Sequence, residues 1–339
     1  MKIWKILSPK VLTEEERPDN ITTDTQAKVK VTRVLLTDEE LRAFGGSAKL
    51  KYPVIPGRFA VGIVGETGTD CVSVEKNTRV YIHDVTPCGA CPQCASGNTD
   101  CCADIQVAGS NRNGYLRDFV VAEESELSPL PASVSDEEAL FIGVVSVCEN
   151  VIGRLGVTKG MHVAVIGAGE TGNILSQLLI YHQAVPILID ADDEKLAVAA
   201  QCGIYYTLKA DDSLAENINR ITGGRSVSGS VYCSFCGLSP DLPFEITAPG
   251  GTVVYAGFTF PEITAQLKTA LDKRLTLTAV TNDYSNNAAA INLLVNKAVN
   301  FAPFRLQKRP VADLAQIFAS ETQKMEKGIR VNYSILNMI

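Results

Sequence analysis

The chain has 339 residues, of which 46% are hydrophobic and 20% charged, and its formal net charge is −7. A chain of this length is expected to form two domains. Its acidic balance argues against nucleic acid as a partner, because phosphate binding requires a basic surface. No apolar run reaches the length of a membrane span and no secretory signal is visible, so we expect a cytoplasmic protein without a membrane partner.

The first 130 residues are predicted to be mainly β-structure. Residues 27–36 alternate polar and apolar side chains, as a half-buried strand does. Shorter β-branched runs, interrupted by Gly, Asp or Asn, occupy residues 59–68, 78–85 and 116–124. Together these runs predict a twisted, barrel-like sheet.

The pattern changes near residue 135. Ser135 and Glu138 have the spacing of a capping box ahead of an apolar helix. From there, apolar strands alternate with helix-like segments up to about residue 283, which predicts a parallel sheet covered on both faces. A helix at residues 313–325 and a strand at residues 328–336 are expected to pack back onto the first domain.

A glycine-rich loop follows the first of these apolar strands. Gly167, Gly169 and Gly172 have the spacing G-x-G-x-x-G and open a helix, and Asp190 ends the next strand. This context predicts a dinucleotide site, in which the helix N-terminus faces the pyrophosphate. A tight strand-to-helix turn without a ligand is the alternative.

The acid after the second strand indicates which dinucleotide is bound. Asp190 is expected to accept hydrogen bonds from the adenosine ribose and to repel a 2′-phosphate, so NAD(H) is favoured over NADP(H). Lys195 either approaches the adenosine or is an ordinary solvated lysine. The loop residues between the glycines complete the predicted cofactor site: Glu170 and Thr171.

Five cysteines lie within residues 88–102, and four of them have metal-ligand spacing. Cys88, Cys91, Cys94 and Cys102 are separated by three, three and eight positions, which suits one tetrahedral zinc ion. A four-thiolate shell leaves no open position, so such a zinc is structural. Cys101 is a spare ligand beside Cys102. Iron–sulfur ligation and an unliganded thiol cluster are the alternatives.

Several stretches resemble one family in their order along the chain. The cysteine lobe, "YPVIPGRFAVGIVGETG", "GYLRDFVVAEESELSPLP" and "VIGAGETG" are similar to the medium-chain dehydrogenase/reductase superfamily, especially its zinc-dependent alcohol and polyol dehydrogenases. The resemblance implies an α/β protein with a GroES-like β-rich catalytic domain and a Rossmann domain with a doubly wound parallel sheet. The catalytic domain is expected at residues 1–144 and 284–339, with its zinc lobe at about 86–104, and the Rossmann domain at 145–283. The resemblance also implies an active site between the domains and a homodimer or homotetramer.

The chain departs from this family at the site of the second, catalytic zinc. Thr37 replaces the family's cysteine ligand, and Arg58 and Phe59 replace the histidine and glutamate of its P-G-H-E motif. Counting back from the glycine loop places Gly143 at the remaining acidic ligand. Arg58 would repel a dication. The sequence therefore predicts one structural zinc and no catalytic zinc.

Three residues could replace the Lewis acid if the site is active. Arg58 could stabilise a developing oxyanion or bind an anionic substrate such as a sugar phosphate. Glu39 takes the place of the family's proton-relay hydroxyl, and Glu40 that of its aspartate behind the metal. With Thr37, these are the candidate catalytic residues. Alternatively, Arg58 forms a buried ion pair with Glu39 or Glu40 that fills the former metal site.

These observations predict an NAD(H)-dependent oxidoreductase that acts on a small alcohol, polyol or carbonyl compound without a catalytic zinc. A zinc-free reductase of activated C=C bonds is one alternative, although such enzymes usually favour NADPH. The other is a dinucleotide-binding protein without enzymatic activity, whose redox site has decayed.

Overall fold

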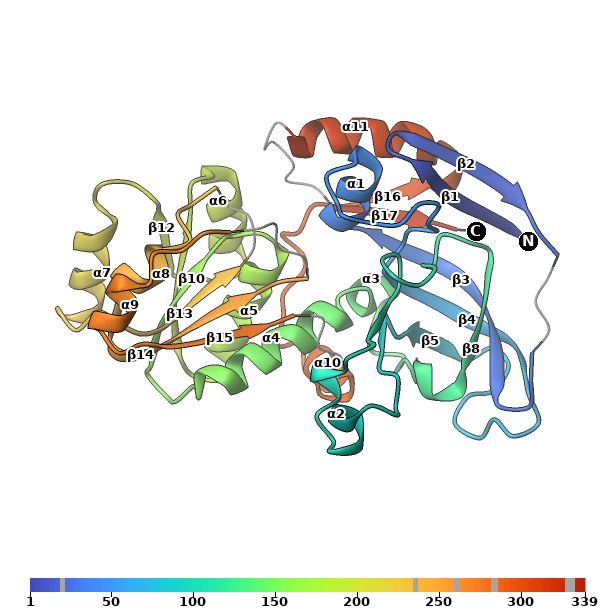
Figure 1. Cartoon of the computed structure of the whole chain (residues 1–339), viewed down its shortest axis with the longest axis horizontal. Helices are drawn as coiled ribbons and strands as arrows, with labels where there is room; N and C mark the ends of the chain where they lie inside the picture. The colour runs from blue at the N-terminus through green and yellow to red at the C-terminus, as the bar shows by residue number, and fades with distance from the viewer. Residues whose placement is uncertain (19–21, 234–236, 259–262, 282–285, 327–332, 339) are drawn as a thin grey trace. The chain divides into compact units, whose positions relative to one another are not determined.

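The chain folds into two structural units in the computed structural model shown in Figure 1. Unit 1 consists of Met1–Gly143 and Arg305–Ile339, and unit 2 of Val144–Phe304. The structure describes residues 1–18, 22–233, 237–258, 263–281, 286–326 and 333–338.

The second domain boundary lies about twenty residues later than expected, after residue 304 instead of before 284. Hydrogen bonds tie the segment in question to unit 2. The backbone N–H of Asn286 donates to Ser146 Oγ at 3.2 Å, and that of Asn300 donates to Gln177 Oε1 at 2.6 Å. The last strand of the series, Thr276–Val280, does end where the sequence indicates. One more helix, Asn287–Val295, follows it and belongs to the same unit.

Unit 1 is built around a seven-stranded sheet with the order β16-β17-β3-β4-β5-β9, in which β8 pairs with β3. All its pairings are antiparallel except that of β16 with β17. Its strands are β3 (Gln26–Leu36), β4 (Phe59–Thr67), β5 (Arg79–Ile82), β8 (Phe119–Glu123), β9 (Leu127–Pro129), β16 (Leu306–Pro310) and β17 (Tyr333–Asn337). Strand β17 pairs with β3, so the C-terminal segment does pack back onto unit 1. Residues 328–332 of the strand expected there lie outside the described residues.

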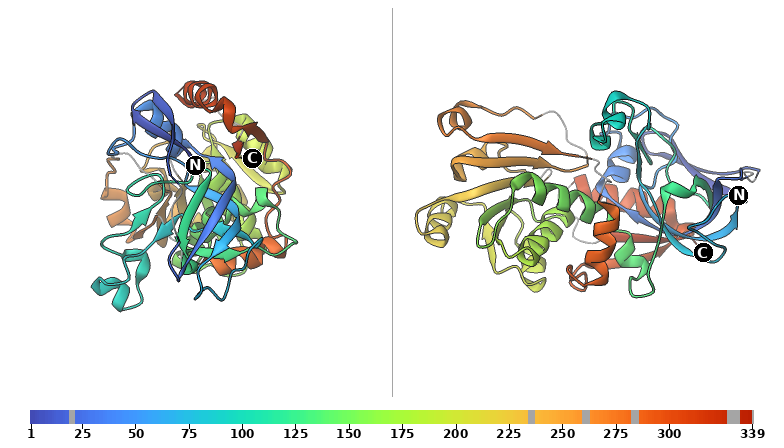
Figure 2. Two further views of the ribbon diagram at one scale, coloured as in Figure 1. Left: turned by 90° about the vertical axis from the view of Figure 1, so that its right-hand side faces the viewer. Right: turned by 90° about the horizontal axis from the view of Figure 1, so that it is seen from below.

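Two small hairpins and a set of short helices complete unit 1. The hairpins are β1 (Lys2–Ser8) with β2 (Val11–Glu16), and β6 (Val85–Thr86) with β7 (Gln106–Val107). The helices are α1 (Asp38–Gly45), α2 (Pro92–Ala95), α3 (Asp136–Ala139) and α11 (Leu314–Glu326), with 3₁₀ turns at Thr99–Cys101, Glu124–Glu126 and Val311–Asp313. Helix α3 begins at the predicted capping box of Ser135 and Glu138. Helices α1 and α11 pack together through the rings of Phe44 and Phe318, at the end of unit 1 that carries the β1–β2 hairpin (Figures 1 and 2).

Unit 2 contains a six-stranded parallel sheet with the order β12-β11-β10-β13-β14-β15. In chain order this is 3-2-1-4-5-6, the doubly wound arrangement of the Rossmann fold. The strands are β10 (His162–Ile166), β11 (Val185–Asp190), β12 (Tyr206–Lys209), β13 (Val227–Cys233), β14 (Thr247–Ala256) and β15 (Thr276–Val280). The helices are α4 (Ile142–Leu155), α5 (Glu170–Tyr181), α6 (Asp193–Gln201), α7 (Leu214–Thr222), α8 (Leu242–Ile246), α9 (Lys268–Asp272) and α10 (Asn287–Val295).

Strands β10 and β11 at the centre of unit 2 are buried at every residue after the first, as parallel strands covered on both faces must be. Ala164, Ile166, Ile187, Ile189 and Val227 belong to one buried apolar cluster of this unit. In the described part of the chain, no helix is long and apolar enough to cross a membrane.

Candidate active site, metal centre and cofactor loop

The first turn of helix α1 fixes two of the predicted catalytic residues in a capping box. Thr37 is the N-cap, and its hydroxyl accepts the N–H of Glu39. The Glu40 carboxylate accepts the backbone N–H of Thr37 at 2.8 Å and its hydroxyl at 2.5 Å. Both side chains are buried. Thr37 and Glu40 therefore start the helix, a structural role that accounts for both residues without catalysis.

Glu40 has a second structural contact, because its other oxygen accepts the backbone N–H of Arg58 at 2.9 Å. This bond fixes the start of strand β4 to helix α1. Burial, followed by the neighbouring charge of Glu39, raises the pKa of Glu40. Of the two partners expected for an Arg58 ion pair, Glu39 forms it, whereas Glu40 accepts the backbone N–H of Arg58.

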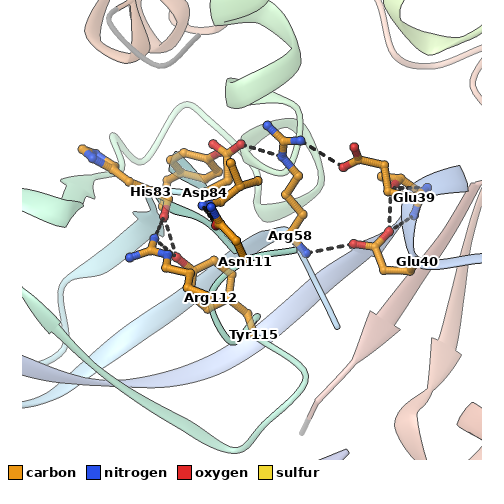
Figure 3. A network of polar contacts seen from close by, with 11 residues as sticks. Glu39, Glu40, Arg58, His83, Asp84, Asn111, Arg112 and Tyr115 are labelled. Carbon is orange, nitrogen blue, oxygen red and sulfur yellow. Dashed lines mark hydrogen bonds and ion pairs between the residues drawn. The ribbon is translucent and has the colours of Figure 1, made fainter. Parts of the chain in front are cut away.

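The guanidinium of Arg58 forms ion pairs with two carboxylates. Nε donates to Asp84 Oδ2 at 2.8 Å and Nη1 donates to Glu39 Oε2 at 3.0 Å (Figure 3). The guanidinium carbon also lies 5.1 Å from the centre of the Phe59 ring. Burial lowers the pKa of Arg58, but the charges of Glu39 and Asp84 outweigh it and leave this pKa raised. The arginine therefore keeps a fixed positive charge in the interior of unit 1.

Asp84 is the member of this cluster that the sequence did not reveal. It follows strand β5, and its second oxygen accepts the hydroxyl of Tyr81 at 2.8 Å. Burial, followed by the charge of Asp84, raises the pKa of Tyr81 well above its ordinary value. No spacing rule connects residues 58, 81 and 84. The only signal available was an acid in a run that otherwise predicts a strand.

Gly143 does lie at this cluster, as the count along the sequence suggested. A Cβ atom at this position would lie 2.6 Å from the Phe59 ring, 2.9 Å from the Tyr81 hydroxyl and 3.0 Å from Asp84 Oδ1. A side chain here would collide with all three groups. The structure thus brings Thr37, Arg58, Phe59 and Gly143 to one place, but none of them offers a metal ligand atom except the Thr37 hydroxyl, which is used in the capping box.

A second polar network holds the turn that carries Asp84. The backbone oxygen of His83 accepts Arg112 Nη2 at 2.7 Å and the Tyr115 hydroxyl at 2.5 Å (Figure 3). Arg112 Nη1 in turn donates to Glu126 Oε1 at 2.7 Å. Burial lowers the pKa of His83, which favours its neutral form. These contacts fix the position of Asp84. The charge that they bring near it, that of Arg112, is paired with Glu126.

The Arg58 cluster differs in solvent access from one member to the next. The side chains of Arg58 and Asp84 are each 2% exposed, whereas that of Glu39 is 21% exposed. Glu39 is therefore the most solvent-accessible of these three side chains. That Arg58 binds an anionic substrate stays a prediction, and its burial between two carboxylates argues against it.

The four cysteines with metal-ligand spacing converge in the lobe around α2. The sulfur atoms of Cys88, Cys91, Cys94 and Cys102 all lie within 4.8 Å of one another. Cys91 Sγ is 3.5 Å from that of Cys94 and 4.0 Å from that of Cys102. A tetrahedral zinc with Zn–S bonds of about 2.3 Å places its sulfurs roughly 3.8 Å apart, so these thiols fit a zinc ion. Cys101, the spare cysteine, is exposed and is not part of this group.

Backbone hydrogen bonds in this lobe favour the thiolate forms of Cys88 and Cys91. The backbone N–H groups of Cys94 and Ala103 lower the pKa of Cys91 to about 6, and those of Ala90 and Cys91 lower the pKa of Cys88. Desolvation, followed by hydrogen bonds to neighbouring cysteines, raises the pKa of Cys94 to about 12. Four thiols this close cannot all ionise unless a cation balances their charge, which is what a bound zinc would supply.

The glycine loop of unit 2 has the geometry that its spacing predicts. Gly167 has φ +107°, and a Cβ there would lie 2.4 Å from the backbone oxygen of Cys233. A Cβ on Gly172 would lie 1.8 Å from the oxygen of Gly167, so the helix can approach the strand only with glycine here. Gly169 caps helix α5 without a side-chain cap and has open space where a Cβ would be. Glu170 and Thr171 form the first turn of that helix. This is the geometry in which the N-terminus of helix α5 could face a phosphate, so the predicted role of the loop stays a prediction that its geometry suits.

Asp190 ends strand β11, as predicted, and is 2% exposed. Its carboxylate accepts the N–H of Ala168 at 2.6 Å and that of Asp192 at 2.9 Å. A carboxylate has about four acceptor sites, so two remain for ribose hydroxyls. Asp190 therefore fixes the glycine loop in addition to its predicted role. Lys195 lies in the first turn of helix α6 and is half-buried.

Two family models match the chain in series. Residues 23–132 match the alcohol dehydrogenase GroES-like domain, and residues 171–296 match the zinc-binding dehydrogenase. The chain belongs to the medium-chain dehydrogenase/reductase superfamily. As a member of this superfamily it is an oxidoreductase with a GroES-like and a Rossmann part, and it uses a dinucleotide and a small-molecule substrate.

Similar proteins within this superfamily include named polyol and sugar-acid dehydrogenases. A sorbitol dehydrogenase of Halalkalibacterium halodurans is 24% identical over 84% of this chain and 85% of its own. An L-galactonate-5-dehydrogenase of Escherichia coli is 22% identical over 97% of this chain and 98% of its own. Among solved structures, galactitol-1-phosphate dehydrogenase from E. coli has a TM-score of 0.86 and 20% identity, and covers 99% of this chain and 100% of its own.

Proposed function

We propose that the protein is an NAD(H)-dependent dehydrogenase of an alcohol, polyol or carbonyl compound that works without a catalytic metal ion. This proposal rests on the two ion pairs that the buried Arg58 forms, with Asp84 and with Glu39. Phe59 and Gly143 lie in the same cluster. The positions expected to bind a second zinc hold a guanidinium, a phenyl ring and a glycine. These residues do not fit a metal ion, so the positive charge of the site comes from the chain itself.

The members of this cluster would divide the remaining chemistry among them. A bound nicotinamide supplies or accepts the hydride. Glu39 is the cluster's most exposed carboxylate and can exchange a proton with a substrate hydroxyl. Arg58 cannot deprotonate, so it contributes only a fixed charge that positions Glu39 and stabilises negative charge nearby. Asp84 holds the guanidinium in place and is itself held by the Tyr81 hydroxyl.

Replacing Glu39 with glutamine is expected to lower turnover by about 100-fold or more, the usual scale of lost proton transfer, while NADH still binds. Hydride transfer is followed by NADH absorbance, starting with sorbitol and related polyols, and NADH binding by its fluorescence. Asp38→Asn is the control, because it neutralises the adjacent acid of the same helical turn. Full activity of Glu39→Gln would show that Glu39 fills space and moves no proton.

We also propose that Asp190 selects NAD(H) over NADP(H). Asp190→Ser is expected to relax discrimination against the 2′-phosphate by about 1–3 kcal/mol, the scale of one charged hydrogen-bonded contact. Asp190→Asn removes the charge but keeps an acceptor oxygen for the glycine loop. It therefore separates repulsion of the 2′-phosphate from the hydrogen bonding that holds the loop. Asp193→Ser, in the exposed first turn of helix α6, is the control. Equal binding of NADH and NADPH by the unmodified protein would contradict this assignment.

The protein is further proposed to act in the cytoplasm as a homodimer or homotetramer. The reduced thiols of the cysteine lobe suit a reducing compartment. Strand β15 ends the sheet order of unit 2, and Leu277 on it is 41% exposed. Leu271 in helix α9 is 74% exposed, and Leu267 at the N-cap of this helix is 50% exposed. Apolar side chains at and near a sheet edge are suited to contact with another copy of the chain.

A further inference from the structure

The charges of the Arg58 cluster bear on which substrates the proposed dehydrogenase can accept. Arg58 contacts three carboxylates: its guanidinium bonds those of Glu39 and Asp84, and its backbone N–H bonds that of Glu40. Even with Glu40 protonated, the cluster carries one negative charge more than it carries positive. The neighbouring Arg112 does not change this balance, because it is paired with Glu126.

The position of the charges matters as much as their number. The guanidinium is buried between Asp84 and Glu39 (Figure 3). The Phe59 ring centre lies 5.1 Å from its carbon. Glu39 alone among the three carboxylates has substantial solvent exposure, at 21%. A hydroxyl or ammonium group can donate to its oxygens, whereas a phosphate or carboxylate would be repelled at short range.

We propose that Glu39 determines substrate class at this site, so that uncharged or cationic hydroxy compounds are accepted and phosphorylated or carboxylated ones are rejected. This inference rests on the proposed dehydrogenase function. It assigns to Glu39 a direct contact with substrate, and to Arg58 and Asp84 the task of positioning that carboxylate. Arg58 alone would suggest an anion site, but the carboxylates around it outnumber its charge and make the cluster negative as a whole.

Three probes with one carbon skeleton test the proposal: sorbitol, sorbitol 6-phosphate and 1-amino-1-deoxysorbitol. Their dissociation constants for the full-length, NADH-saturated protein are measured by ligand-observed NMR. The phosphate is expected to bind at least about 10-fold more weakly than the other two, the scale of one unit-charge repulsion at contact distance. Glu39→Gln should remove most of this difference. Asp38→Asn should preserve it, because it neutralises a neighbouring acid of the same helical turn and leaves the Glu39 carboxylate in place.

Three results would overturn the inference. The unmodified protein could bind the phosphate as tightly as or more tightly than the other two probes, or bind none of the three. The third is a charge preference that Glu39→Gln leaves unchanged. A parallel hydride-transfer assay separates this inference from the proposed function. The expected ranking without any turnover would support charge selection by Glu39 and count against the dehydrogenase proposal.

Discussion

Replacing Arg58 with alanine is expected to lower the free energy of unfolding by about 3–5 kcal/mol, the usual cost of removing one partner from a buried ion pair. The loss is large because Asp84 stays buried with its charge uncompensated, and Glu39 loses its partner as well. Burial and the paired carboxylates act together here, so the cost exceeds that of removing side-chain contacts alone. Urea unfolding followed by circular dichroism measures the change.

Rescue distinguishes a charge effect from a packing effect. In Arg58→Met with Asp84→Asn, the buried charge is gone and an amide oxygen still accepts the Tyr81 hydroxyl. This double variant is expected to regain a substantial part of the lost stability, since an apolar side chain of similar volume often replaces a buried ion well. Arg17→Ala removes an exposed pair with Glu15 and should leave stability nearly unchanged. Arg58→Met alone is the reference, because it fills the same volume but leaves the charge of Asp84 in place. Equal stability of Arg58→Met and the double variant would show that the uncompensated charge of Asp84 is not the cause of the loss.

Metal analysis of the dialysed protein is expected to find one zinc per chain. The four sulfurs of the cysteine lobe fit a single tetrahedral ion, and the residues around Arg58 do not fit a second. Changing Cys102 to serine should reduce the zinc content to near zero. It should also make the lobe between residues 86 and 104 sensitive to proteolysis, because the metal supplies much of the folding free energy of such small closed sites.

Cys101 provides the matched control for this experiment. It is adjacent to Cys102 but exposed, and it lies outside the group of converging sulfurs. Cys101→Ser should therefore keep one zinc per chain. Two zinc ions in the unmodified protein, or loss of zinc from Cys101→Ser but not from Cys102→Ser, would contradict the assignment.

Local patterns in the sequence predicted most of the fold, because the relevant signals lie within a few residues of one another. The capping box at Ser135, the glycine loop and the alternation of residues 27–36 all correspond to observed elements. Short or weakly patterned elements were not predicted: the β1–β2 hairpin, strand β12 and helix α1. The residues of helix α1 were interpreted only as site residues, although Thr37 and Glu40 form a second capping box.

The candidate site was harder to predict because its contacts are distant in sequence. Arg58 was recognisable as a charge in an unexpected place, but its partner Asp84 is 26 residues away and follows a different strand. The sequence contains several acids at comparable distances. Only the pairing of β4 with β5 decides which of them reaches the guanidinium. An arginine considered without that partner suggests an anion site, whereas the structure surrounds its guanidinium with carboxylates.

The guanidinium of Arg58 is part of the polypeptide, and this affects how the site is completed in a cell. A metal ion must be delivered, can be removed by a chelator and can be replaced by a wrong ion of higher affinity. A guanidinium held by Asp84 and Glu39 is present as soon as unit 1 folds. If the proposed metal-free site is correct, zinc supply matters to this protein only through the cysteine lobe. The Arg58 cluster would then be complete once the chain has folded, with no metal-loading step.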